Sequence, residues 1–298
     1  MIKKTLATTK KFHSYQKERF PLVVLGLSFL PAILSSGAVM SRHTTWVQAV
    51  FALVASLAYL LHVRVVDEHR DFEHDNLHHT ARPIQVGTIS KEELRQVDTA
   101  AVVLLIVIAA VMGPLALILV ALMLVYSYFA EKEFFIGEHI RRHFFIYNGV
   151  NLVQMLFLQF FVYAIFANPF PFTTLVWAHF LFTTVGTVIF EFVRKLKRPG
   201  DDGSGKDTYT WHMGFSNALI VYALLLLLNT ILFFWIAALI PPLAAGWLVF
   251  LLALVGSTYL TALMHWVKKT RQTDQIMQLS FLIQYGIFNL VIYFLVFH

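Results

Sequence analysis

The sequence predicts an all-α membrane protein, a polytopic bundle of about nine transmembrane helices around a central cavity. Its composition is the first reason: 58% of the 298 residues are hydrophobic and only 13% are charged, against about 25% charged residues in soluble domains. The second reason is that apolar runs of about 20 residues, the length that crosses a bilayer, recur along the chain. The third is that the charged residues gather between these runs. The chain has no cysteine, which excludes a disulfide-stapled fold.

The apolar runs set the number of spans. They cover residues 20–40, 46–66, 97–113, 114–130, 144–166, 173–193, 215–237, 239–266 and 277–297. Only Gly113 and Pro114 separate the third run from the fourth. One helix through both would have about 33 residues, which is too long for a single crossing, so we expect a tight hairpin. We expect a basic cytoplasmic N-terminal segment at residues 1–19 and a single nine-helix domain at residues 20–298.

The basic residues indicate the orientation of the protein. With nine spans, 22 of the 23 Lys and Arg residues fall on one side of the membrane and only Arg42 falls on the other. This asymmetry is the positive-inside pattern, which places that side in the cytoplasm. We therefore expect an integral, multi-pass protein of the bacterial inner (plasma) membrane with a cytoplasmic N-terminus. The net charge of +6 then reflects orientation in the lipid bilayer, and we expect no nucleic acid partner.

The acidic residues indicate a cation-binding function. All 17 Asp and Glu lie on the predicted cytoplasmic side, and after the second span the chain reads D-E-H-R-D-F-E-H-D from position 67. If the helix continues beyond the membrane, Asp67, Asp71 and Asp75 line one of its faces. Carboxylates so placed repel one another, and Mg²⁺, held by one or two carboxylates and by phosphate oxygens, relieves the repulsion. The alternative is a solvated acidic helix balanced by Arg70 and Arg82.

Four histidines crowd the same stretch and suit a transition metal such as zinc. They are His69, His74, His78 and His79. They do not form one clean helical face, and there is no cysteine to join them. We therefore expect these histidines to have a peripheral role.

This acidic stretch resembles the first aspartate-rich motif of the UbiA superfamily of intramembrane prenyltransferases, N-D-x-x-D-x-x-x-D followed by R-P and a glycine. Asp67 stands in the place of the Asn and Glu68 in the place of the first Asp, so both substitutions keep acidic side chains. The other positions of the motif are matched by Asp71, Asp75, Arg82, Pro83 and Gly87. The motif follows the second of nine spans, and this architecture extends the resemblance over nearly the whole chain.

The second acidic motif of the family, roughly D-x-x-x-D after the sixth span, is altered here. Glu191 is followed four residues later by Lys195, so the pair of aspartates is absent. Glu191 and the aspartates of the glycine-rich loop that follows, Asp201, Asp202 and Asp207, are the candidate ligands in this region. The basic run from Arg194 to Arg198 fits either a membrane anchor or a diphosphate-binding segment.

The resemblance implies a reaction and a set of site residues. A UbiA-type enzyme transfers a prenyl group from a polyprenyl diphosphate to a lipophilic acceptor, commonly aromatic, and Mg²⁺ assists the departure of the diphosphate. The implied metal ligands are Asp67, Glu68, Asp71, Asp75, Glu191, Asp201 and Asp202. The implied diphosphate-binding residues are Arg19, Arg82, Lys132, Arg194 and Lys195. The implied catalytic residues are Asp71, Asp75 and Lys132. The alternative for Arg19 and Lys132 is a snorkelling anchor at the membrane surface.

Three polar residues are expected to line the substrate cavity. Tyr128 lies four residues before Lys132, where the family commonly has a Tyr and a Lys. Asn148 and Asn151 lie on one side of the fifth predicted helix. Polar groups inside a membrane usually face the bundle interior or a wet cavity, although a hydrogen bond between helices explains any single one of them.

Two other functions fit parts of the sequence. A UbiA-type terpene cyclase ionises a prenyl diphosphate and folds the chain upon itself, and the altered second motif favours such a different second step. A divalent-cation transporter could use the acidic rim as a vestibule. Against the transporter, no acidic residue lies deep in a span, whereas ion pathways usually bury charge near the midplane.

Overall fold

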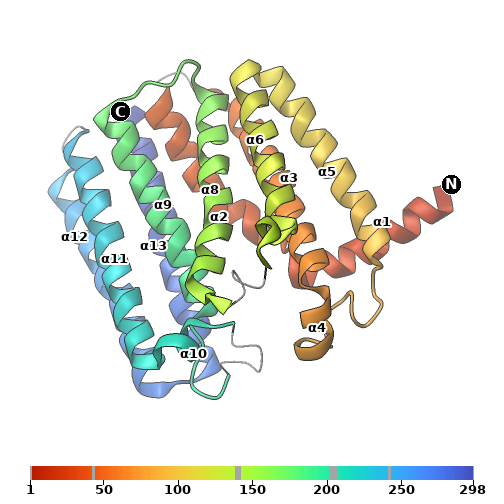
Figure 1. The fold of residues 1–298 in the computed structure, drawn as a ribbon. Helices are drawn as coiled ribbons and strands as arrows, with labels where there is room; N and C mark the ends of the chain where they lie inside the picture. The colour runs from red at the N-terminus through yellow and green to blue at the C-terminus, as the bar shows by residue number, and fades with distance from the viewer. Residues whose placement is uncertain (1, 42–43, 138–141, 202–206, 241–242, 298) are drawn as a thin grey trace. The chain divides into compact units, whose positions relative to one another are not determined.

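The computed structural model describes the chain except for residues 1, 42–43, 138–141, 202–206, 241–242 and 298. The described residues form helices joined by turns and loops, with no β-strand among them (Figure 1). Nine of these described helices are long and apolar enough to cross a membrane, which confirms the predicted number. They are α2 (Leu22–Met40), α3 (Trp46–Arg70), α5 (Lys91–Met112), α6 (Pro114–Glu131), α8 (Phe144–Phe166), α9 (Thr174–Lys195), α11 (Phe215–Ala238), α12 (Ala245–Lys268) and α13 (Arg271–Phe297).

The predicted hairpin between the third and fourth spans is confirmed. Gly113 ends α5 with a φ of +116°, and Pro114 begins α6. Glycine tolerates this backbone conformation because it has no Cβ, and proline suits the first helical position because an N–H there has no intrahelical partner. The largest differences from prediction are at the starts of three spans. Helix α5 begins at Lys91 instead of residue 97, α12 begins at Ala245 instead of residue 239, and α13 begins at Arg271 instead of residue 277.

The chain divides into two compact units. Unit 1 comprises Met1–Leu30 and Thr45–Asn168, and unit 2 comprises Pro31–Thr44 and Pro169–His298. Helix α2 is therefore shared between them, and the division falls at Pro31, inside the helix. Proline lacks a backbone N–H, so α2 loses one of its helical hydrogen bonds at this point.

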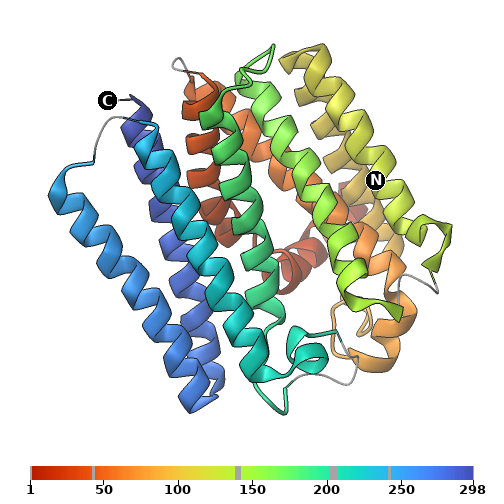
Figure 2. The ribbon, with the colours of Figure 1, turned by 60° about the vertical axis from the view of Figure 1, so that its left-hand side comes forward.

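Unit 1 is built around α3, which packs against α5, α6 and α8. Helices α5 and α6 run side by side in both views (Figures 1 and 2). Three further elements complete the unit: α1 (Ile2–Arg19), α4 (Phe72–His78) and the short 3-10 helix η1 (Glu133–Phe135). Lys11 Nζ lies 2.7 Å from Glu93 Oε1 in the first turn of α5, so an ion pair joins α1 to α5.

In unit 2, α9 packs against α11 and α13, and α12 packs against α13 and α11. A short helix, α10 (Tyr209–Met213), precedes α11. Buried polar side chains join the long helices: Ser35 Oγ lies 2.9 Å from His179 Nε2 and donates to Asn289 Oδ1 at 2.6 Å. Hydrogen bonds between helices satisfy polar groups that have no water to bind in an apolar surrounding.

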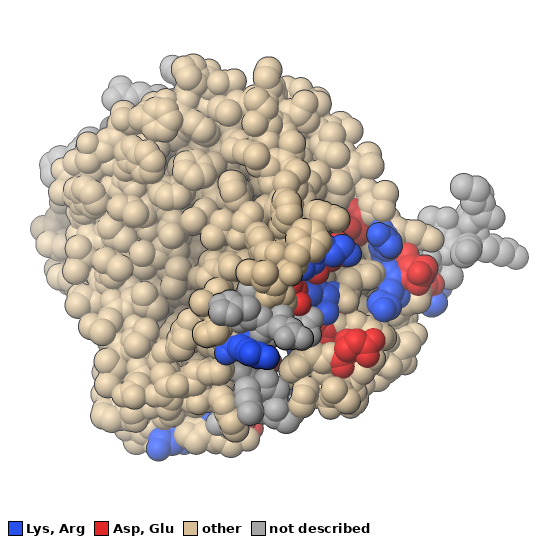
Figure 3. Space-filling model, viewed as in Figure 1, with Lys and Arg blue, Asp and Glu red and all other residues tan. Residues whose placement is uncertain are grey.

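The flanks of the long helices are apolar on their exposed sides. Large hydrophobic side chains are exposed in both units, among them Val23, Val111, Leu224 and Leu260. In Figure 3, the charged residues occupy a limited part of the visible face and the rest shows none. An exposed apolar surface of this extent is expected of helices that contact lipid hydrocarbon.

Candidate active site

The acidic segment lies in unit 1, where the second span ends. Helix α3 continues past the apolar run to Arg70, and Asp71 with φ −91° and ψ 6° separates it from α4. Asp67 and Asp71 remain one helical turn apart, and the Asp71 amide donates to the Asp67 carbonyl at 2.9 Å. Asp75 belongs to α4, so the three aspartates do not share one continuous helix.

Arg70 neutralises the first two aspartates. Its Nη2 lies 2.6 Å from Asp67 Oδ1, and its Nε lies 3.0 Å from Asp71 Oδ1. The Arg70 side chain is 4% exposed, whereas those of Asp67 and Asp71 are 29% and 32% exposed. The sequence pattern predicts that a metal ion relieves the repulsion between these carboxylates. In the structure, the guanidinium group of Arg70 relieves it.

Two side chains of α8 complete this cluster. The Tyr147 hydroxyl donates to Asp71 Oδ1 at 3.2 Å, and the Arg70 guanidinium lies 5.1 Å from the centre of the Tyr147 ring. Arg70 Nη1 donates to Asn151 Oδ1 at 3.3 Å. Asn151 is among the residues expected from the sequence, and Tyr147 is not. The only sequence signal for Tyr147 is that it precedes Asn151 by four residues and so shares a helical face with it.

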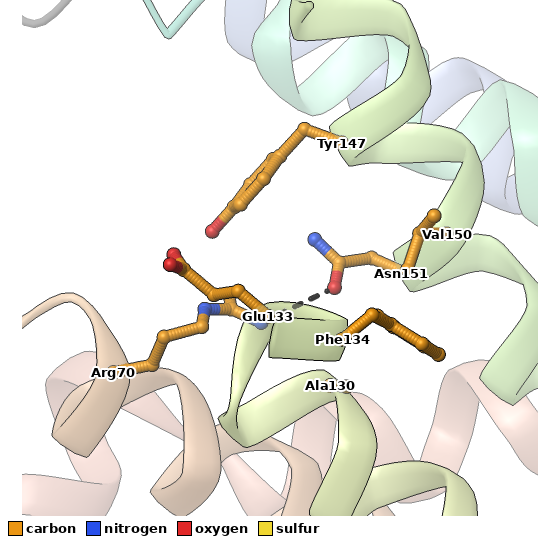
Figure 4. A pocket seen from close by; sticks show the side chains of 7 residues that line it. All are labelled: Arg70, Ala130, Glu133, Phe134, Tyr147, Val150 and Asn151. Atoms are coloured by element: carbon orange, nitrogen blue, oxygen red, sulfur yellow. Dashed lines mark hydrogen bonds between the residues drawn. The ribbon is translucent and has the colours of Figure 1, made fainter. Parts of the chain in front are cut away.

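A small, open recess lies beside the Arg70 cluster (Figure 4). Its lining comes from α3, α6, η1 and α8, and consists of Arg70, Ala130, Glu133, Phe134, Tyr147, Val150 and Asn151. Asn151 therefore lines this recess. Asn148 is buried and donates to the Phe144 carbonyl at 2.7 Å, and Tyr128 is 53% exposed; neither belongs to this lining.

Glu68 lies in a different environment from its neighbour Asp67. Its Oε1 accepts hydrogen bonds from Arg64 Nη2 at 2.7 Å, from Arg19 Nε at 2.9 Å and from the Tyr15 hydroxyl at 3.4 Å. The Glu68 side chain is only 1% exposed. Burial, and next the charge of Glu68, raise the pKa of Tyr15, so its hydroxyl stays protonated. Arg19 and Glu68, expected at the diphosphate and the metal, are placed in a buried ionic cluster between α1 and α3.

Asp75, Arg82 and Lys132 also have partners in unit 1. The Asp75 carboxylate is buried and accepts from Arg82 Nη1. Lys132 follows α6 and lies 3.2 Å from the adjacent Glu131 carboxylate. Because Lys132 is exposed and its partner is a surface neighbour, the ion pair is weak and the ammonium group can reach another anion.

In unit 2, Glu191 pairs with the basic residues that follow it. Its carboxylate lies 2.8 Å from Arg194 Nη2 and 2.9 Å from Lys195 Nζ. Lys195, which stands where an aspartate was expected, thus forms an i,i+4 ion pair with Glu191. Asp201 lies 2.6 Å from Arg198, and Asp202 lies outside the described residues. Burial raises the pKa of nearby Tyr209 to about 12, with a smaller contribution from the Glu191 charge.

The two carboxylates beside Arg70 can supply part of the ligand set of a magnesium ion. Among the described residues, no three carboxylate or imidazole groups converge on a common point. Asp67 and Asp71 nevertheless offer two accessible carboxylates one turn apart. Mg²⁺ commonly binds one or two carboxylates and takes its remaining ligands from substrate phosphates and water. The pair therefore fits an ion that takes its remaining ligands from water and, when substrate is bound, from phosphate oxygens.

The histidines near the aspartates contact one another and the backbone. The His74 and His78 ring centres lie 4.6 Å apart, and His69 Nδ1 bonds the Val65 carbonyl at 2.8 Å within α3. No group of three possible metal ligands forms among them in the described chain.

Comparison with known proteins gives a family and a set of similar folds. The family model described as "UbiA prenyltransferase family" matches residues 23–286. A UbiA homolog from Aeropyrum pernix K1, solved in the apo form, has a TM-score of 0.66 at 16% identity, over 89% of this chain and 97% of that one. A UbiA homolog from Archaeoglobus fulgidus bound to GPP and Mg²⁺ has a TM-score of 0.62 at 15% identity, over 95% and 99%.

A third similar structure concerns digeranylgeranylglyceryl phosphate synthase, with a TM-score of 0.59 at 15% identity over 97% of this chain and 99% of that one. At these identities the structural likeness shows a common fold. No curated protein sequence matches the chain.

Proposed function

This chain belongs to the UbiA prenyltransferase family and is an integral, multi-pass membrane protein, and we propose that it transfers the prenyl group of a polyprenyl diphosphate to an aromatic acceptor. The observation that carries the proposal is the pair of partly exposed carboxylates, Asp67 and Asp71, one turn apart beside a recess lined by aromatic and polar side chains. The solved relative bound to GPP and Mg²⁺ supports the same substrate class and metal here.

Asp67 and Asp71 would hold Mg²⁺ in this proposal. When bound, the ion neutralises the charge that develops on the diphosphate oxygens as the allylic carbon–oxygen bond breaks. Asp75 and Glu68, the other motif carboxylates, keep their arginine partners and support the segment. Lys132 supplies a mobile cation for the diphosphate, and Arg82 adds charge next to Asp75.

The carbon side of the reaction needs protection from water. The diphosphate leaves with the bonding electron pair, and an allylic cation remains. Tyr147 and Phe134 line the recess, and aromatic rings attract such a cation by roughly 0.5–2 kcal/mol for each ring. The electron-rich acceptor ring then forms the new carbon–carbon bond and loses a proton.

Residues of unit 2 are further candidates for the substrate and metal sites. Arg194 and Lys195, which share the Glu191 carboxylate in unit 2, are further candidates for diphosphate binding, and Glu191 and Asp201 for the metal. The family match spans both units, which supports one functional domain at residues 20–298. The positive-inside pattern supports a cytoplasmic N-terminus and a cytoplasmic Asp67–Asp71 pair.

The first test is diphosphate release by the purified protein. Polyprenyl diphosphates of several lengths are supplied with Mg²⁺, with and without a panel of aromatic acceptors, and the products are identified by mass spectrometry. Release that requires an acceptor and yields a prenylated ring supports the transferase. Release without an acceptor, giving a new hydrocarbon or terpene alcohol, supports a cyclase instead. If no diphosphate is released under any condition, metal-flux measurements in vesicles test the transporter.

The Asp71→Asn variant tests the metal-binding pair directly. We expect turnover to fall at least about 100-fold, because electrostatic stabilisation of the leaving group is a large contribution, while the protein still folds. Glu73→Gln, an exposed carboxylate on α4, is the matched control and should keep its activity. Mg²⁺-dependent turnover at the wild-type rate in Asp71→Asn would remove Asp71 from the mechanism.

A further inference from the structure

The turn after α6 is strained at the mouth of the recess. Glu133, Phe134 and Phe135 follow one another with φ values of 49°, 53° and 59°. The left-handed region is unfavourable for residues with a Cβ, and three consecutive non-glycine residues there need support from their surroundings. Strain of this kind is found where function requires a particular geometry. Here it brings Glu133 and Phe134 into the lining of the recess.

The Glu133 carboxylate lies against Gly137. A Cβ at Gly137 would contact the Glu133 carboxylate, at 3.1 Å from its Cδ and closer still to Oε2. Only a glycine at this position leaves the carboxylate where it is. Figure 4 shows the Glu133 side chain above the Arg70 guanidinium, with its carboxylate toward the Tyr147 hydroxyl.

Arg70 thus has three acidic residues around it. Its Nη2 and Nε bind Asp67 and Asp71, and Glu133 lines the same recess as Arg70. Two further contacts of Arg70, from its Nη1 to Asn151 and from its guanidinium to the Tyr147 ring, involve none of these acidic residues. They can persist while Nη2 and Nε change partners.

A divalent cation on Asp67 and Asp71 competes with the present contacts of Arg70. The guanidinium binds Asp67 Oδ1 and Asp71 Oδ1, and two positive charges on the same carboxylates repel. We propose that Arg70 is a positioning residue that exchanges between the Asp67–Asp71 pair in the metal-free site and Glu133 in the metal-loaded site. Glu133 thereby raises the affinity of the site for the metal. This inference rests on the proposed function only in taking Asp67 and Asp71 as the metal ligands.

The proposed exchange predicts that replacing Arg70 and replacing Glu133 change the metal affinity in opposite directions. Arg70→Gln removes the competing cation, so the metal should bind about tenfold more tightly. Glu133→Gln removes the second partner of Arg70, which then stays on the aspartates, so the metal should bind about fivefold more weakly. Gly137→Ala displaces the Glu133 carboxylate without changing any charge and should weaken binding in the same direction.

The experiment measures Mn²⁺ binding to the purified full-length protein without prenyl diphosphate, from the electron paramagnetic resonance of free Mn²⁺. Each variant has a control with the same change in net charge. Arg64→Gln, whose guanidinium binds Glu68, matches Arg70→Gln, and Glu131→Gln, whose carboxylate binds Lys132, matches Glu133→Gln. Arg70→Lys keeps a cation and should stay within about threefold of the wild type. Size-exclusion profiles and melting temperatures confirm that each variant is folded.

The double variant Arg70→Gln/Glu133→Gln separates exchange from simple electrostatics. If Glu133 acts through Arg70, Glu133→Gln no longer changes the Mn²⁺ affinity once Arg70 is replaced. If the effects of the two substitutions on the Mn²⁺ affinity add, Glu133 acts only as a nearby charge, and the exchange is wrong. Equal shifts in Arg70→Gln and Arg64→Gln, or weaker binding in Arg70→Gln, also overturn it.

Asp71→Asn distinguishes failure of the inference from failure of the proposed function. If Asp71→Asn abolishes Mn²⁺ binding but Arg70→Gln does not tighten it, only the exchange is wrong. If Mn²⁺ fails to bind, or binds equally well to Asp71→Asn, both the exchange and the assignment of the metal to Asp67 and Asp71 are wrong.

Discussion

The hydroxyl of Tyr147 donates to the carboxylate of Asp71, at 3.2 Å from Oδ1 and 3.3 Å from Oδ2, although the two residues are 76 positions apart. The bond joins the first turn of α8 to the point where α3 ends. Asp71 is therefore oriented from two directions, by the phenol of Tyr147 and by the guanidinium of Arg70. The Tyr147 bond can keep the Asp71 carboxylate in a fixed direction when a cation takes the place of Arg70.

Tyr147→Phe should lower turnover about tenfold at subsaturating Mg²⁺, because partners that orient a metal ligand typically contribute 10–100-fold to metal affinity or activity. Diphosphate release across a Mg²⁺ titration measures this effect. Tyr259→Phe is the control: its hydroxyl donates to the Ala223 carbonyl at 3.0 Å in unit 2. It should change thermal stability without changing the Mg²⁺ dependence. An unchanged Mg²⁺ dependence in Tyr147→Phe would show that Asp71 needs no support from α8.

Glu68→Gln should destabilise the fold by about 3 kcal/mol, because removal of one partner leaves Arg19 and Arg64 without their counter-charge. Thermal unfolding of the purified protein measures the loss, with the exposed Glu73→Gln as a neutral control. The Mg²⁺ concentration for half-maximal turnover should stay within about twofold of the wild type. The opposite result, a changed Mg²⁺ dependence at unchanged stability, would make Glu68 a metal ligand, as the sequence motif implies.

Gly186→Ala should destabilise unit 2 by roughly 1–3 kcal/mol, the usual effect of overpacking. A Cβ at Gly186 would lie 2.6 Å from Tyr285 Cζ, and the Tyr285 ring is held between Phe182 and Phe281, with ring centres at 5.3 and 5.8 Å. Gly256→Ala in α12 is the matched control, since nothing lies within 4 Å of its Cβ position. Melting temperatures of the two variants should differ by several degrees, and equal values would mean that Tyr285 moves freely.

Arg198→Gln should raise the pKa of Asp201. The hydrogen bond and charge of Arg198 hold that pKa below its ordinary value. A lowered pKa in the folded state means that the pair stabilises the fold above the ordinary titration range of aspartate, near pH 3.9. This contribution is lost as the pH falls through the lowered pKa.

Carbon NMR of the labelled aspartate carboxyls measures the change, with Asp201→Asn assigning the signal. In Arg198→Gln the midpoint should move up toward the ordinary value, and 1 M salt should move it up in the wild type, because exposed pairs are screened. Arg271→Gln removes a weaker influence on Asp201 and should shift the midpoint less. A shift that is equal in both variants would mean that no specific pair exists.

The spans were predictable because the sequence property that sets them is local. A helix must carry about 20 apolar residues to cross the bilayer, so the apolar runs predicted the nine long helices of the described chain and the break at Gly113 and Pro114. The spacing of Asp67 and Asp71 was also local, since residues four apart meet on a helix. The same motif supported the resemblance to the family to which the chain belongs.

The partners of the motif residues were decided by tertiary structure. Asp67 and Glu68 are adjacent in sequence, but successive helical residues point about 100° apart, so one contacts Arg70 and the other is buried against Arg19 and Arg64. The sequence alone ranked both as metal ligands, because the acidic pattern does not say which face of α3 another helix covers.

Tyr147 and Glu133 could not be selected from local pattern. Tyr147 reaches Asp71 only because α8 belongs to the same unit as α3. Glu133 reaches the recess through a left-handed turn with no glycine among its three residues. Local preferences oppose such a turn, so only packing with the rest of unit 1 can maintain it. The sequence by itself determined the helices and the acidic character of the site, and tertiary packing decided which carboxylates remain accessible to a cation.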